Sequence, residues 1–454
     1  MELPAPCRDL EQIFRAALAS VDPQQLVASR LKLAGSRLTI ATEASPLVID
    51  LSCYDQLLVL GAGKASAAMA RGLEMVLGAR IDQGLIVVKY GHTTPLEHIE
   101  TLQAGHPIPD TNSLEGARRL MALAEKADGR TLVINLLSGG ASALLAAPLA
   151  AAGVTLSLED KQETTRLLLA CGATIHELNT VRKHLSAIKG GRLARLLHPA
   201  RCLNLILSDV VGDRLDVIAS GLTVPDPTTF AEARAVLKRY NLCRQLPVPV
   251  IDLLQKGVAG AICETPKAGD AAFENISNLL LGSNLLALRA AAEQARELGY
   301  HSAELTARAA GEARDLAGLL LSLANDVRDH QLLVRRPACL LAGGETTVTL
   351  QGTGKGGRNQ ELALAFLAAL AELPDRGAGI YLLSAATDGN DGPTDAAGAF
   401  ACSELLASAR QAGLDPGAYL RRNDAYTFFE GLGALLRTGP TNTNVCDLQI
   451  ILVP

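Results

Sequence analysis

Short apolar runs alternate with longer segments of helical spacing along most of this chain. The runs Gln56–Leu60, Leu85–Lys89, Leu132–Leu137 and Cys202–Leu207 are almost continuously apolar, whereas Leu114–Ala127 between them repeats its apolar residues at helical spacing. Strands that are covered on both faces read this way in parallel sheets, where each pair of strands is joined by a crossover helix. The alternation therefore predicts an α/β fold built on a parallel sheet.

A chain of 454 residues is too long for one ordinary hydrophobic core, so two domains are expected. The strand–helix pattern loosens around Pro247–Asp270, where Pro and Gly gather, and restarts with a strand at Asn278–Leu281. We predict an N-terminal Rossmann-like α/β domain at residues 1–265. A C-terminal α/β domain is predicted at residues 270–454.

The segment Leu341–Phe366 carries an unusual concentration of signals in the second domain. It reads as an apolar strand, a Gly-Gly-Glu turn, a Thr-rich strand, a glycine loop with Lys355 and Arg358, and a helix. The Thr-rich strand follows its neighbour too closely for a crossover, which predicts antiparallel pairing and a mixed sheet. Glycines let backbone amides approach an anion, a helix start adds positive charge, and arginine offers a planar donor fork. The segment thus predicts an enzyme that handles a polyanion.

Composition excludes several classes of protein. With 48% hydrophobic and 20% charged residues, the chain is expected to fold, and a net charge of −5 without a basic run argues against nucleic acid. Nine cysteines without a CxxC pair predict idle thiols in a reducing compartment. The start lacks a signal peptide, and the uncharged stretch Ala141–Leu158 reads as a buried helix followed by a loop rather than as a membrane span. We expect a cytoplasmic protein that binds neither membranes nor nucleic acid.

Polar or glycine-rich turns follow five of the predicted strands. Ligands in open α/β sheets bind beyond the carboxyl ends of the strands, so these turns are candidates for one site. The turns are Gly61–Lys64, Ser138–Ser142, Ser208–Asp209, Gly343–Glu345 and Thr387–Gly392.

Within these turns, two cations and three carboxylates are candidates for chemistry. Lys64 follows a glycine turn at a helix start, and Arg358 lies where its charge opposes the helix dipole, so a bound anion would suit both residues. Each could instead be a solvated surface cation. Asp209, Glu345 and Asp388 could cap turns, hold Mg²⁺ or accept a proton from an attacking hydroxyl.

Other chemistries are less well supported. Gly61-Ala62-Gly63 is half of a dinucleotide fingerprint, but Ser66 replaces its last glycine and the next strand ends in Lys89 rather than in an acidic residue. The eight histidines show no zinc-ligand spacing, and His106 is expected to be a loop residue rather than a catalyst.

Long motifs in this chain resemble the glycerate 2-kinase family. The resemblance runs through nearly the whole sequence, and the part at about residues 336–454 is similar to that family's MOFRL domain. The matching strings are HPIPD at His106–Asp110, INLLSGGASALL at Ile134–Leu145, LNTVRKHLSAIKGGRLA at Leu178–Ala194, SDVVGD at Ser208–Asp213, SGLTVPDPTTF at Ser220–Phe230, GGETTVTLQGTGKGGRNQELAL at Gly343–Leu364, TDGNDGPTDAAGA at Thr387–Ala399 and PTNTNVCDLQI near the end.

The resemblance implies two α/β domains with the active site in the cleft between them. It also implies ATP-dependent, Mg²⁺-assisted phosphorylation of D-glycerate at its 2-hydroxyl. The lysine of the GAGKA turn and the arginine of GGRNQE, which form the family's functional pair, are Lys64 and Arg358 here. We expect these two and Asp209 to be catalytic, and Glu345 and Asp388 to contact Mg²⁺. The predicted phosphate- and substrate-binding residues are Gly61, Gly63, Ser138, Gly139, Gly140, Ser142, Gly356, Gly357 and Asn359.

Two other functions and one assembly stay open at this stage. Some members of the family have been labelled hydroxypyruvate reductases, and a nicotinamide-dependent reductase would use a similar small acid. A non-catalytic sensor of sugar acids would bind glycerate without releasing ADP. The sequence leaves a homodimer as an open option.

Overall fold

The computed structural model describes residues 3–42, 45–373 and 377–454. The chain forms two compact units. The N-terminal unit consists of Pro23–Leu281, and the C-terminal unit combines Met1–Asp22 with Gly282–Pro454. Each unit contains one six-stranded sheet covered by helices.

The sheet of the N-terminal unit has the order β11-β10-β7-β4-β5-β6. Strand β7 pairs in parallel with β4 and β10, and β5 pairs in parallel with β4 and β6. The predicted parallel α/β sheet is therefore confirmed. Its strands are β4 (Gln56–Ala62), β5 (Gln83–Lys89), β6 (Ile99–Ala104), β7 (Thr131–Leu137), β10 (Arg201–Leu207) and β11 (Ile276–Gly282).

Strand β11 was expected to open the second domain, but it completes the first sheet instead. It lies at the edge next to β10, where Asn204 Nδ2 donates to Asn278 Oδ1 at 2.9 Å. The sequence loosens before this strand because the chain passes through α10 (Val248–Val258) and an irregular stretch before it returns to the sheet.

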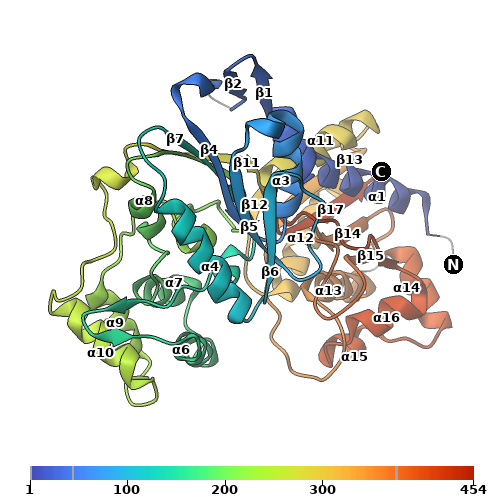
Figure 1. Cartoon of the computed structure of the whole chain (residues 1–454). Helices are drawn as coiled ribbons and strands as arrows, with labels where there is room; N and C mark the ends of the chain where they lie inside the picture. Colours follow the sequence, from blue (N-terminus) through green and yellow to red (C-terminus); the bar gives the residue numbers. More distant parts are fainter. Residues whose placement is uncertain (1–2, 43–44, 374–376) are drawn as a thin grey trace. The chain divides into compact units, whose positions relative to one another are not determined.

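Helices cover the sheet and build two hydrophobic clusters. Helix α4 lies beside β5 and β6 (Figure 1), and its buried Leu120 packs in one cluster with Leu60, Val87 and Leu197. A second cluster lies beneath α6, α7, α9 and α10 and includes the fully buried Phe230. The helices are α2 (Pro23–Arg30), α3 (Ser66–Leu77), α4 (Thr111–Ala124), α5 (Ala141–Leu144), α6 (Leu158–Ala170), α7 (Ile175–His184), α8 (Arg192–Leu197), α9 (Phe230–Arg239) and α10.

The uncharged stretch after β7 forms less helix than expected. Only α5 is helical, and the chain then forms a hairpin of β8 (Ala150–Ala151) and β9 (Val154–Thr155). Helix α5 ends at Leu144, Pro148 precedes the hairpin and Gly153 adopts a positive φ of 75° at its turn, so the chain does not resume a helix in this stretch. A separate three-stranded sheet is formed by β1 (Leu31–Ala34), β2 (Arg37–Ile40) and β3 (Leu47–Asp50).

The sheet of the C-terminal unit is mixed, as predicted, but for a different reason. Its order is β12-β13-β17-β14-β15-β16, with β12 parallel to β13 and the other pairs antiparallel. The predicted Thr-rich strand is not formed, because both edges of β13 are taken by β12 and β17. Thr347 makes only an isolated bridge with Glu312. The strands are β12 (His301–Ala309), β13 (Ala338–Gly344), β14 (Tyr381–Ala386), β15 (Gly398–Cys402), β16 (Leu435–Leu436) and β17 (Asp447–Val453).

Helix α1 (Ala5–Ser20) packs with the C-terminal unit, on α11 (Asn284–Glu297) and β14. The Asp9 carboxylate accepts a hydrogen bond from Tyr300 Oη at 2.7 Å. The boundaries of the two compact units differ from the expected domain ranges 1–265 and 270–454, which stay a prediction. The remaining helices are α12 (Ala313–His330), α13 (Arg358–Glu372), α14 (Ser403–Gln411), α15 (Pro416–Arg421) and α16 (Ala425–Leu432). In the part of the chain that the structure describes, every helix is too short or too polar to cross a bilayer.

Candidate active site

Two of the predicted turns are joined at the carboxyl ends of β4 and β7. The Lys64 N–H donates to the Gly139 carbonyl at 2.8 Å, and the Ala65 N–H donates to Ser138 Oγ at 3.0 Å. Gly63 has φ +139°, and a β-carbon there would lie 2.1 Å from Ser138 Oγ. Only glycine fits this position. The contact holds Lys64 at the start of α3, directly beside the Ser138–Ser142 turn.

Asp209 joins these turns from the end of β10, the neighbour of β7. A β-carbon on Gly139 would lie 2.1 Å from Asp209 Oδ2, so the carboxylate rests directly against the Gly139 backbone. The N-terminal unit therefore brings four residues together at the carboxyl ends of its interior strands: Lys64, Ser138, Gly139 and Asp209. Their grouping follows from the parallel order of β4, β7 and β10.

We expect Gly139→Ala to lower turnover strongly, because the added methyl group forces the Asp209 carboxylate away from the turn. The loss should be on the order of tenfold or more, since a small displacement of a positioned group costs at least that much. Gly129→Ala is the matched control. Gly129 precedes the same strand at its opposite end, and its nearest foreign atom would be 4.0 Å from the new β-carbon. Steady-state kinetics of both variants test this, and equal activity of the two would contradict it.

His106 approaches the same turn from the loop after β6. A β-carbon on Gly140 would lie 3.0 Å from His106 Nε2 and 3.5 Å from Lys64 Cγ. Burial lowers the pKa of His106, and the positive charges of Lys64, Lys89, His92 and Arg182 add to this shift, so that the pKa falls to about 4. No local sequence pattern connects this histidine with Lys64.

The His106 ring should therefore stay neutral at pH 7. The unfolded chain takes up this proton near pH 6.5 and the folded chain only near pH 4, so the ring reduces the free energy of unfolding as the pH falls between these values. An NMR titration of the histidine ring protons, with the His106 signal assigned by a His106→Gln variant, measures the midpoint. A midpoint at or above the ordinary histidine value would show that this account of the site's charge is incorrect.

The basic corner Arg182-Lys183-His184 on α7 is divided between two roles. Lys183 Nζ lies 3.3 Å from Asp226 Oδ1, and His184 Nε2 lies 3.2 Å from Glu264 Oε2. Arg182 forms no ion pair within the described part of the chain, and it lines a cavity instead. Burial lowers the pKa of its guanidinium. Lys183 and His184 therefore contact carboxylates within the fold, whereas Arg182 faces the cavity.

Lys189 is the functional candidate that the sequence reading missed most clearly. Its side chain is 2% exposed, and its Nζ donates to Ser142 Oγ at 2.9 Å. Ser142 Oγ also lies 2.8 Å from Ser220 Oγ, which donates to Asn179 Oδ1 at 3.1 Å. Burial, together with the charges of Arg182 and Lys161, holds the pKa of Lys189 well below its ordinary value. Lys189 belongs to the family motif that contains IKGGR, but the motif alone does not indicate that this lysine is buried.

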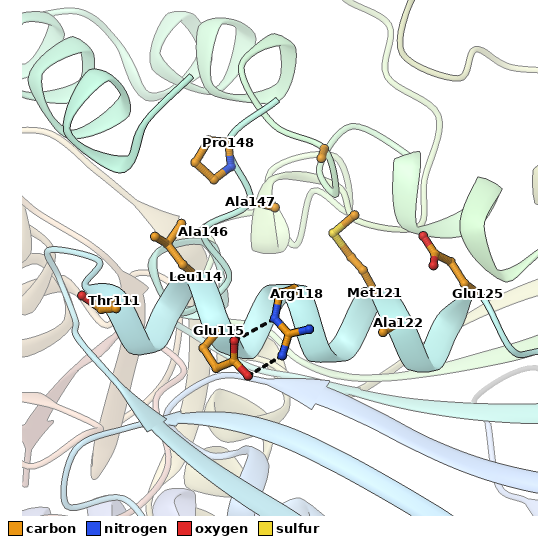
Figure 2. Close-up of a pocket in the computed structure, with 11 residues that line it drawn as sticks. Thr111, Leu114, Glu115, Arg118, Met121, Ala122, Glu125, Ala146, Ala147 and Pro148 are labelled. Carbon is orange, nitrogen blue, oxygen red and sulfur yellow. Dashed lines mark hydrogen bonds and ion pairs between the residues drawn. The ribbon is translucent and has the colours of Figure 1, made fainter. Parts of the chain in front are cut away.

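These groups border a cavity of about 780 Å³ inside the N-terminal unit. His106, Gly140, Ser142, Arg182 and Lys189 line one part of it. A different cavity, of about 520 Å³, runs along α4 (Figure 2), and its Arg118 is already paired with Glu115 at 2.6 Å. None of the sequence-predicted site residues lines this second cavity. The larger cavity is therefore the better candidate for ligand binding in this unit.

In the C-terminal unit, Arg358 is held by two carboxylates. Its Nη1 lies 2.7 Å from Glu345 Oε1, and its Nη2 donates to Asp447 Oδ1 at 2.9 Å. Burial alone would lower the pKa of Arg358, but the hydrogen bond and charge of Asp447, with the charge of Glu345, raise it above the ordinary value. Burial raises the pKa of Asp447, and Arg358 opposes that shift. Arg358 is thus a fixed, permanently charged group that lines a cavity of about 440 Å³.

The start of α13, expected to face an anionic ligand, is occupied by Asp391. Its carboxylate accepts from the Asn359 N–H at 3.0 Å and the Gln360 N–H at 2.8 Å. Burial raises the pKa of Asp391 to about 7, although these amides oppose the shift. A phosphate could reach the amides only by displacing Asp391.

Lys355, the other cation of this glycine loop, contacts an aromatic ring. Its Nζ lies 4.0 Å from the centroid of the Tyr426 ring, which is a cation–π contact.

Two carboxylates predicted for Mg²⁺, Glu345 and Asp388, belong to this unit, and Asp388 lines the same cavity as Arg358. Among the described residues, no three His, Cys, Asp or Glu side chains cluster closely enough to hold a metal alone. Mg²⁺ commonly uses one or two carboxylates together with substrate phosphates and water, so this donor set fits such an ion. A cation at Glu345 would compete with Arg358 for Oε1.

The chain is similar to known proteins over nearly its whole length. A family model described as a domain of unknown function (DUF4147) matches residues 9–255, and the MOFRL family model matches residues 338–447. The glycerate 2-kinase of Pyrococcus horikoshii is 37% identical over 438 residues, which cover 96% of this chain and 95% of that protein. A protein of Agrobacterium vitis, provisionally named hydroxypyruvate reductase, is 42% identical over 447 residues, covering 98% and 94%.

The crystal structure of glycerate kinase from Thermotoga maritima matches with a TM-score of 0.84 at 37% identity, covering 98% of this chain and 99% of that one. The fold and the joined strand-end turns, with these relatives, define an α/β enzyme of the kinase class. The chain belongs to the glycerate 2-kinase family.

Proposed function

We propose that the protein is an ATP-dependent glycerate 2-kinase that converts D-glycerate into 2-phospho-D-glycerate and ADP. The similarity to glycerate 2-kinases over nearly the full length carries this proposal. The local geometry supports it, because cations and glycine-rich turns gather where phosphate and carboxylate groups have to be held. Such a reaction depends on positioning and charge neutralisation more than on covalent chemistry.

In the proposed reaction, the 2-hydroxyl oxygen of glycerate attacks the γ-phosphorus of ATP. A new O–P bond forms as the bond between the γ-phosphorus and the ADP oxygen breaks, and the hydroxyl proton passes to a carboxylate. Asp209 is the first choice for that carboxylate because it lies against Gly139, beside the Lys64 turn, and Asp388 is the second. Lys64 and Arg358 would neutralise the charge of the phosphates or of the glycerate carboxylate.

The other predicted residues have binding roles in this proposal. The Ser138–Ser142 turn would hold phosphate or glycerate through its backbone amides. Gly61 and Gly63 shape the neighbouring turn, and Gly356, Gly357 and Asn359 shape the start of α13. Glu345 and Asp388 would hold Mg²⁺, which offsets negative charge on the phosphates when it is bound.

Release of ADP in a coupled assay tests the proposal, and it should require both ATP and D-glycerate. The reductase alternative is favoured by the name of the Agrobacterium vitis relative. Ser66, however, uses its hydroxyl within the turn contact, donating to the Leu136 carbonyl at 3.2 Å, and β5 ends in Lys89. Mixing the protein with hydroxypyruvate and NADH should therefore leave the NADH absorbance unchanged. NADH consumption without any ADP release would replace the kinase by the reductase.

A further inference from the structure

We propose that the cavity of the N-terminal unit between the His106–Pro109 loop and α6 is the site for the purine nucleotide. The polyphosphate would lie against Arg182 and Ser142, and the base would lie against Ile108 and Leu169, all four of which line the cavity. The choice of a nucleotide rests on the proposed kinase function. The assignment goes further by naming the unit and the residues that hold ATP.

Three basic side chains belong to the cavity lining. Arg182, Lys161 and Lys189 all line it, and none of the three forms an ion pair in the part of the chain that the structure describes. Lys189 instead donates to Ser142, and Lys161 Nζ donates to the Ala147 carbonyl at 3.4 Å. Burial lowers the pKa of Lys161 to about 7, and Arg182 and Arg192 contribute to that shift. Neighbouring buried cations repel one another unless an anion shares their charge, so these three side chains suit a polyanion.

The cavity lining also includes two large apolar side chains that are exposed. Ile108 is 69% exposed and Leu169 is 61% exposed, although both line the cavity. Gln162 and Leu169 lie on one face of α6 at a spacing of seven residues. Gln162 Nε2 donates to the Pro109 carbonyl at 2.7 Å, which ties α6 to the loop that carries Ile108. The two apolar side chains thus belong to walls that are fixed to each other.

The combination fits a nucleotide better than it fits glycerate. A cavity of about 780 Å³ is in the range of sites for drug-sized ligands, whereas a three-carbon acid would leave most of it filled with water. Glycerate also has no apolar surface to cover Ile108 and Leu169. A purine base with a polyphosphate tail matches both kinds of lining residue, because aromatic rings favour apolar walls and phosphates favour arginine.

Binding of ADP to the full chain, measured by isothermal titration calorimetry, tests this assignment. Leu169→Glu places a carboxylate on the apolar wall, and Arg182→Ala removes a cation that has no acidic partner to lose. Each should weaken ADP binding by about tenfold or more, the range expected for a buried charge or for a lost charge-assisted hydrogen bond. Met75→Glu on α3 is the matched control, since Met75 is 58% exposed and lies outside the cavity. Tripolyphosphate should lose affinity for Arg182→Ala but keep it for Leu169→Glu.

The assignment would be overturned if ADP bound both variants within about twofold of its affinity for the original protein, a change too small to reflect a lost contact. It would also be overturned if both variants raised the KM for D-glycerate while ADP binding stayed unchanged, because the cavity would then belong to the acid. The result for ADP binding can be distinguished from the result for kinase activity. Weakened ADP binding in a protein that phosphorylates no glycerate would support the nucleotide site and reject the kinase proposal.

Discussion

Replacing Lys64 by alanine should reduce turnover by on the order of 10²-fold or more, if its charge stabilises the transferring phosphoryl group. The side chain begins at a turn that is fixed by Gly63 and by the Gly139 carbonyl. The backbone of Lys64 is therefore held in place by contacts within the N-terminal unit. Because Lys64 is only half-buried, the variant should fold normally, and steady-state kinetics with ATP and D-glycerate give the loss in kcat and in kcat/KM.

Lys126→Ala is the control for this experiment. Lys126 is exposed near the end of α4, in the same unit, and removal of its charge should leave turnover within about twofold, as for most surface substitutions. Circular dichroism establishes that both variants are folded. A folded Lys64→Ala protein with near-full activity would remove this lysine from the mechanism.

Replacing Asp226 by alanine should destabilise the N-terminal unit by about 3 kcal/mol, because it removes the nearer and fully buried partner of Lys183 and leaves this charge only Asp216, 3.9 Å away. The side chains of Lys183 and Asp226 are 4% and 0% exposed, and their charged atoms lie 3.3 Å apart. Asp226 Oδ1 also accepts from the Thr228 N–H at 3.1 Å. Burial would raise the pKa of Asp226, but Lys183 and Thr228 hold it below the ordinary value, so the carboxylate is charged at neutral pH. A denaturant unfolding curve followed by far-ultraviolet circular dichroism measures the change.

Two comparisons make this prediction specific. Asp252→Ala removes an exposed partner of Lys256, 3.1 Å away on the same helix, and should cost less than about 0.5 kcal/mol. The double variant Lys183→Met with Asp226→Leu should recover much of the loss, because it removes both buried charges. If Asp226→Ala unfolds at the same denaturant concentration as Asp252→Ala, the buried pair is not the stabilising element described here.

The sequence predicted the elements whose signals are local. The apolar runs of β4, β5, β7 and β10 are covered on both faces, so they read as strands without any knowledge of their neighbours. Strand-end turns could be predicted to meet because parallel strands place their carboxyl ends at one edge. The contacts among Lys64, Ser138 and Asp209 follow from that rule.

Features that depend on distant partners could not be predicted in this way. The Thr-rich segment after β13 has good strand propensity, but β17, from the end of the chain, occupies the position beside β13. Asp391 takes the amides of α13 from a loop 31 residues away from Gln360. The division of Arg182, Lys183 and His184 between a cavity and two carboxylates depends on Asp226 and Glu264, which no local pattern connects to α7.

Identification of the product by ³¹P NMR, after incubation with ATP and D-glycerate, tests the central claim most directly. Transfer to the 2-hydroxyl predicts a phosphate signal that is split by the single proton on the neighbouring carbon, with one ADP formed for each product molecule. A signal split by the two protons of a CH₂ group would show transfer to the 3-hydroxyl. No phosphorylated acid at all, from folded protein supplied with Mg²⁺, would contradict the proposed kinase activity itself.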